Sequence, residues 1–183
     1  MHTKNEENNN HHSHDGSHCG CGCHHHGNHK KTAPMESIDN FEKLSLTNSQ
    51  ISVLVELHHC KYLPISRFVM SSSVQAEAVF IALAPVYLTS VNETIEDVKM
   101  MGTIFTKLAE KGLISLDYDI ELSNYDYSLY TYSEVYKHFE QTVAEGKKQK
   151  NFLCDISEIE LGSMALTALG QRVVNHIMAE HAH

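Results

Sequence analysis

Apolar residues recur every three or four positions over several stretches of this chain, which is the spacing of an amphipathic helix. The first stretch follows Thr47-Asn48, which offers an N-cap, and it predicts a helix over about 48–60. A second stretch follows a capping box at residues 90–93 and predicts a helix to about 111, with Gly112 as its stop. Two more helices are expected near 131–145 and 166–178.

The stretch between the first two helices is ambiguous. Ser72-Ser73-Val74-Gln75 resembles a capping box, and the alanine-rich residues 76–84 that follow it end at Pro85, which predicts a helix. Val79-Phe80-Ile81 leaves a buried strand open as the alternative. Residues 61–70 are expected to form a loop or a short strand. Residues 113–118 predict a strand, with residues 160–164 in its antiparallel partner.

Composition separates the first 34 residues from the rest of the chain. They contain almost no aliphatic side chain, so they cannot bury enough apolar surface to offset the entropy of ordering. We therefore expect residues 1–34 to be a disordered tail in the absence of metal. Residues 35–183 have the length of one ordinary domain with its own core.

The tail has the composition of a metal-binding segment. Thiol and imidazole donors crowd into residues 19–29, and alternating glycines let the three thiolates turn toward one ion. Soft thiolates with imidazoles favour Zn²⁺ and also suit Ni²⁺, Co²⁺ or copper. The spacing differs from that of a folded zinc module, so a flexible chelating tail is expected. The candidate ligands are Cys19, Cys21, Cys23, His24, His25, His26 and His29.

Other features bear on location and activity. Two cysteines, Cys60 and Cys154, lie outside the tail; they are too few for a disulfide framework and are expected to be small buried residues. The chain has no run of eighteen apolar residues and no secretory signal, which predicts a cytoplasmic protein without membrane contact. None of the common nucleotide-binding, hydrolase or metalloprotease motifs occurs, so no enzyme activity is expected.

Two short motifs resemble a known family. Residues 108–114, Leu-Ala-Glu-Lys-Gly-Leu-Ile, and residues 166–170, Leu-Thr-Ala-Leu-Gly, are similar to segments that flank the wing of MarR-type regulators. The resemblance covers about 46–175 and implies an α+β, mainly α, winged helix-turn-helix. Such proteins are often homodimers and usually repressors that bind duplex DNA. Here residues 119–158 would be an insertion that expands the wing.

The charge pattern suits DNA poorly. The presumed recognition helix offers three cations, Lys99, Lys107 and Lys111, and its first turns carry acidic residues that interact favourably with the helix dipole. The expected wing has no Lys or Arg between Gly112 and Tyr136. The whole chain has a formal net charge of −9, whereas phosphate neutralisation supplies most non-specific DNA affinity.

The insertion is rich in tyrosine, with six of the eight tyrosines between Tyr118 and Tyr136. They could bind a protein partner, but aromatic side chains more often pack against a core, and that interpretation is preferred. The period-two spacing of Tyr125 and Tyr127, and of Tyr130 and Tyr132, suggests strands.

Two other clusters could in principle bind metal. Residues 58–60, His-His-Cys, are adjacent on a helix and point about 100° apart, so they should not converge on one ion. His176 and Glu180 are expected to form an exposed helical pair.

Together these patterns predict a winged-helix protein with a metal-binding tail, acting as a metal-responsive transcriptional regulator. The alternative is an adaptor or metal-handling protein that does not bind DNA and uses the domain for protein interaction. Fold resemblance alone does not separate the two, because function resides in the site.

Overall fold

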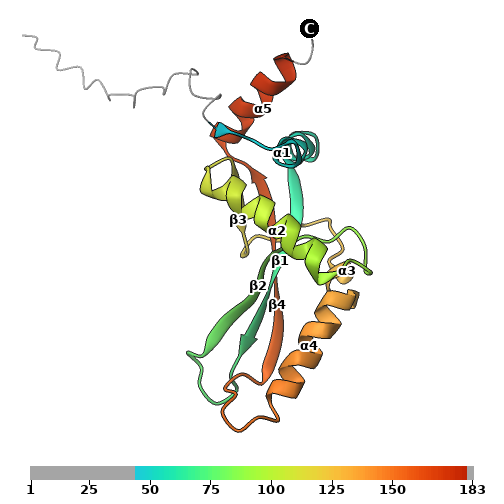
Figure 1. Ribbon diagram of the computed structural model, residues 1–183, viewed down its shortest axis with the longest axis vertical. Coiled ribbons are helices and arrows are strands. Elements are labelled where there is room, and N and C mark those ends of the chain that lie inside the picture. Colours follow the sequence, from blue (N-terminus) through green and yellow to red (C-terminus); the bar gives the residue numbers. More distant parts are fainter. Residues whose placement is uncertain (1–43, 181–183) are drawn as a thin grey trace, which may run out of the picture. The chain divides into compact units, whose positions relative to one another are not determined.

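The computed structural model describes residues 44–180, which build a four-stranded antiparallel sheet together with five helices (Figure 1). The strand order is β2-β1-β4-β3, and β1 pairs with β2 on one side and with β4 on the other. The elements in chain order are α1 (Asn48–Cys60), β1 (Tyr62–Ser71), β2 (Val79–Val86), α2 (Ile95–Glu110), β3 (Ile114–Asp117), α3 (Ser128–Tyr132), α4 (Glu134–Gly146), β4 (Ile156–Leu166) and α5 (Ala168–Glu180).

This architecture shows that the predicted winged helix-turn-helix is wrong. The helix expected over residues 76–84 is absent, and its residues form β2, the edge strand beside β1. The Ser72 hydroxyl accepts from the amides of Val74 and Gln75, so it caps a tight turn rather than a helix. Val79, Phe80 and Ile81 favour the extended conformation, and pairing with β1 decides the outcome.

The two helices predicted on either side of this hairpin are confirmed. The Thr47 side chain caps α1 through a capping box with Gln50. In α2 the capping box is formed by Thr94 and Asp97, four residues later than predicted. Gly112 has a φ of 69°, which favours glycine, and it follows α2 as expected.

The predicted pairing of residues 113–118 with 160–164 is also confirmed, but these strands do not form a wing. β3 and β4 are neighbours in the four-stranded sheet, with Leu116 opposite Met164. The long connection between them folds into α3 and α4, and α4 contacts both β1 and β4. The inserted residues therefore cover part of the sheet instead of extending a wing hairpin.

Two tyrosines of this connection complete the hydrogen bonding of the inner strands. The Tyr127 hydroxyl donates to the Gly162 carbonyl at 2.6 Å. Gly162 is the residue of β4 next to Ser163, where the pairing of β4 with β3 ends. The buried Tyr130 hydroxyl donates to the Pro64 carbonyl at 2.9 Å. Pro64 lies in β1, before Ser66, where the pairing of β1 with β2 begins. The preferred interpretation of these tyrosines as packing residues is confirmed, whereas the strand predicted by the spacing of Tyr130 and Tyr132 is wrong, because α3 is helical.

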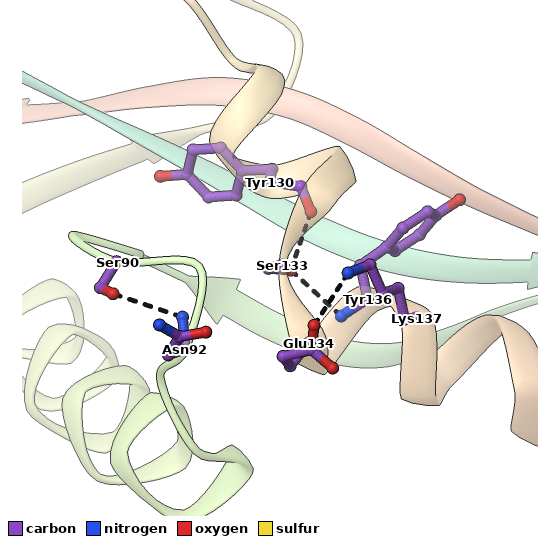
Figure 2. Close-up of polar contacts among 7 residues, drawn as sticks. All are labelled: Ser90, Asn92, Tyr130, Ser133, Glu134, Tyr136 and Lys137. Carbon is purple, nitrogen blue, oxygen red and sulfur yellow. Dashed lines mark hydrogen bonds and ion pairs between the residues drawn. The ribbon is translucent and has the colours of Figure 1, made fainter.

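Ser133 joins the two insertion helices, as Figure 2 shows. Its buried hydroxyl donates to the Tyr130 carbonyl at 2.8 Å and accepts from the Tyr136 amide at 3.1 Å, so one side chain ends α3 and caps α4. The Glu134 amide donates to the Val91 carbonyl at 2.9 Å. This bond ties the start of α4 to the segment that precedes α2.

The apolar interior consists of two clusters that share β1. Leu63 and Ile65 pack with α1, α2 and α5 in the first, whereas Phe68 packs with the insertion in the second. Odd- and even-numbered side chains of a strand lie on opposite faces, so β1 supplies both clusters. In the second cluster the Phe68 ring lies 5.1 Å from that of Tyr136, edge to face.

Replacing Tyr130 by phenylalanine should leave the buried Pro64 carbonyl without its donor. We expect the free energy of unfolding to fall by about 1–3 kcal/mol, the usual cost of an unpaired buried polar group, as measured by urea denaturation. Tyr132→Phe is the matched control, because that side chain is 66% exposed. Equal losses in the two variants would contradict a role for the Tyr130 hydroxyl in completing the sheet.

Candidate functional site

The predicted metal ligands of the tail lie outside the described residues. They are Cys19, Cys21, Cys23, His24, His25, His26 and His29. Within residues 44–180, no group of three or more His, Cys, Asp or Glu side chains is placed to hold a metal ion.

The side chains of His58, His59 and Cys60 point to different places, in agreement with the geometry expected for adjacent helical residues. His58 Nδ1 lies 2.7 Å from Gln171 Nε2, while His59 Nδ1 lies 2.7 Å from the Val55 carbonyl. Cys60 is exposed, so its predicted burial is wrong, whereas Cys154 is buried as expected.

His176 and Glu180 form the exposed helical pair that was predicted. The distance from His176 Nε2 to Glu180 Oε1 is 3.3 Å. Across residues 44–180, none of the helices combines the length and hydrophobicity needed to cross a membrane.

The three lysines predicted to contact DNA are not equivalent. Lys111 Nζ donates to the Leu44 carbonyl at 2.6 Å, so its ammonium group holds the segment before α1 against the end of α2. Lys99 and Lys107 are exposed and line one groove. The structure therefore brings two of the three candidates together and gives the third a structural partner.

This groove runs between α2 and β2 and has a volume of about 490 Å³. Gly102 lets the helix approach the strand closely, since a Cβ atom at that position would lie 2.8 Å from the Pro85 carbonyl oxygen. The lining residues are Leu83, Ala84, Pro85, Lys99, Gly102, Thr103, Thr106, Lys107 and Glu110.

The groups of the groove that remain available to bind a ligand are its charged side chains. The hydroxyls of Thr103 and Thr106 each donate to a helix carbonyl at 2.9 Å, so their donor capacity is already used. Two ammonium groups and the Glu110 carboxylate remain beside an apolar wall formed by β2. Such a surface suits a polypeptide that carries both an apolar side chain and a carboxylate.

Acidic residues at the start of α2 have structural partners. Asp97 accepts from the Thr94 hydroxyl at 2.7 Å, and the Glu93 carboxylate accepts from the Thr89 amide and hydroxyl, both at 2.7 Å. Their negative charges stabilise the N-terminal end of the helix dipole. They also place negative charge where a recognition helix would approach phosphate.

Beside the groove lies an apolar edge strand, unpaired on its outer side within residues 44–180, that sequence reasoning missed. β2 is a terminal strand of the sheet, and Val79, Phe80 and Ile81 are 52%, 47% and 57% exposed. No charged residue occurs between Glu77 and Glu93. The sequence signal for this edge was the Val-Phe-Ile triplet, which left a strand open as the alternative. The alanines around it led to the prediction of a helix instead.

Comparisons with known proteins give no family. No family model and no curated protein matches the chain. The chain is similar to a solved structure described as that of the uncharacterized protein from the hydrocarbon-degrading marine bacterium Alcanivorax borkumensis SK2. The identity is 12%, the match covers 78% of this chain and 99% of that one, and the TM-score is 0.43.

Adding one methyl group at Gly102 tests the close contact between α2 and β2. Alanine favours helices by about 1 kcal/mol over glycine, but here its Cβ would crowd the Pro85 carbonyl. We expect Gly102→Ala to lose about 1–3 kcal/mol of stability through overpacking, as measured by urea denaturation. Thr103→Ala, at the exposed neighbouring position, is the control. A more stable Gly102→Ala variant would contradict the contact.

Proposed function

We propose that this chain is a metal-handling protein that binds one Zn²⁺-class ion through its N-terminal tail and acts through protein contacts rather than on duplex DNA. The observation that carries the proposal is the donor set of residues 19–26, in which three cysteines precede three histidines. Thiolates and imidazoles are the usual ligands of zinc and also suit copper, nickel and cobalt.

The electrostatics of α2 support the part of the proposal that concerns DNA. The Lys111 ammonium is occupied by the Leu44 carbonyl, which leaves Lys99 and Lys107 to meet phosphates. Glu96 and Asp97 in the first turn of α2 would repel a phosphate backbone. A groove with one apolar wall, beside a sheet edge that is unpaired within residues 44–180, is instead a common setting for polypeptide recognition.

The tail and the domain would then have separate tasks. Metal binding neutralises thiolates and brings distant tail residues together, so it can change what the tail presents to a partner. The domain supplies a surface that stays folded whether or not metal is bound. We therefore assign metal capture to residues 19–29 and macromolecular contact to the domain.

Metal titration of the full chain tests the first task. Isothermal titration with Zn²⁺ should give one tight site, and affinity should fall as pH is lowered, because the thiolates and imidazoles must be deprotonated to bind. Replacing Cys19, Cys21 and Cys23 together by serine should leave only weaker imidazole binding. Cys60→Ser is the matched control, since that exposed cysteine lies on α1. Unchanged affinity in the triple variant would rule out the thiolate site.

Fluorescence anisotropy with duplex DNA tests the second task. If α2 supplies the phosphate contacts, its two available lysines imply a shallow salt dependence, with a slope of about −2 in log K against log salt at about −0.9 per phosphate. We expect weak binding that is reduced further in the Lys99→Ala/Lys107→Ala variant and is unaffected by Glu77→Gln. Tight, steeply salt-dependent binding by the full chain would favour direct regulation of DNA instead.

A further inference from the structure

Residues 79–81 at the outer edge of β2 lack the usual protection of a sheet edge. Natural edge strands are commonly guarded by charged side chains, proline or bulges that prevent pairing with another chain. Residues 79–83 carry no charge and no proline, and Val79, Phe80 and Ile81 precede the two bulges of the hairpin, the first of which is at Ala82. Val79 and Ile81 lie on one face of the strand and Phe80 on the other, all exposed.

The open part of this edge has a definite length. β2 pairs with β1 on its inner side, and no other strand within residues 44–180 pairs with its outer side. Pro85 has no amide hydrogen, and it contacts Gly102 of α2 through its carbonyl oxygen. A further strand could therefore pair regularly along residues 79–81, before the bulge at Ala82 and before α2 begins to cover β2.

We propose that the outer edge of β2 binds the same edge of a second copy of this chain, antiparallel and about a two-fold axis near Phe80. The interface is isologous, so each side must complement itself. Antiparallel pairing at this register places Phe80 opposite Phe80 and Val79 opposite Ile81, and the regular pairing ends before the bulge at Ala82. Every cross-strand pair is then apolar, which is the pairing that stabilises a sheet.

At this register the groove of each copy would be occupied by the β1–β2 loop of the other copy. Continuing the strand of the second copy beyond Val79 brings its β1–β2 loop, residues 72–78, alongside Leu83–Pro85 and α2. The loop carries Val74, which is 89% exposed, and a single charged residue, Glu77. The groove offers an apolar wall together with Lys99, Lys107 and Glu110, so its charged groups sum to a net positive charge. Opposite charges would thus meet twice, once on each side of the axis.

The loop is already ordered in a way that lowers the entropy cost of docking. Asp155 accepts from both the amide and the hydroxyl of Ser73 at 2.7 Å, and Ser72 caps the turn that follows. The hydrogen bond from the Ser73 amide, and to a smaller extent the one from the Ser73 hydroxyl, holds the pKa of the Asp155 carboxyl below its ordinary value. A preformed loop loses little conformational freedom when it binds.

Sedimentation velocity on the full chain, over a range of protein concentrations, tests the proposal. We expect a reversible dimer both in chelator and with zinc. Ile81→Lys would place an ammonium group opposite the apolar Val79 on each side of the axis and should raise the dissociation constant at least about tenfold. Ile120→Lys, at a similarly exposed position between β3 and α3, should leave it unchanged. Circular dichroism melts of both variants establish that they fold.

Charge reversal tests the register. Glu77→Lys and the Lys99→Glu/Lys107→Glu variant should each weaken the dimer, and combining them should restore it. Amide hydrogen exchange at residues 79–81 should slow with increasing protein concentration in the wild type and not in Ile81→Lys.

A monomer at every concentration, or a dimer indifferent to Ile81→Lys, would overturn the proposal. So would a dimer that requires zinc and the tail cysteines, because that result would place the contact in the tail. A dimer that persists in chelator would support the edge contact even if the tail bound no metal.

Discussion

The pairing of β1 with β4 is the interaction on which the rest of the domain depends. It runs through ten residue pairs, from Tyr62 opposite Ala165 to Ser71 opposite Ile156, and joins segments almost a hundred positions apart. Because β1 is paired on both sides, its side chains can enter both hydrophobic clusters. The helices at one end and the insertion at the other are therefore held by one strand, and removing either partner of the pair would expose both clusters.

What could be predicted from the sequence was mainly local. α1 and α2 have capped starts and long apolar periodicity, so their own residues determine them. β3 and β4 were recognised from short apolar segments on each side of the insertion. In contrast, residues 72–86 carry signals for two structures, since a serine that can cap a helix can also cap a turn. Only pairing with β1 decides between them, and this pairing cannot be read from a short window.

The candidate site was predicted in part for the same reason. Helical spacing placed Lys99 and Lys107 on α2 correctly, but it could not reveal that the Leu44 carbonyl engages Lys111. The groove depends on Gly102, whose close contact with Pro85 links residues from two elements. Its apolar wall comes from β2, which had been predicted as a helix. The groove lies between β2, whose residues were predicted as a helix, and α2, which was predicted correctly. It could therefore be recognised only once the sheet was known.

The hydroxyls of Tyr127 and Tyr130 have a consequence for how this domain can be reduced in size. A connection can be shortened when it is an exposed loop tip that contributes little to the interior. Here the connection between β3 and β4 supplies donors to Gly162 and Pro64 and half of the second cluster. Excising it and joining β3 to β4 by a tight turn would leave carbonyls and apolar side chains of the inner strands open to water. A minimal version of this domain must retain α3 and α4, and the natural places to graft foreign sequence are other loops.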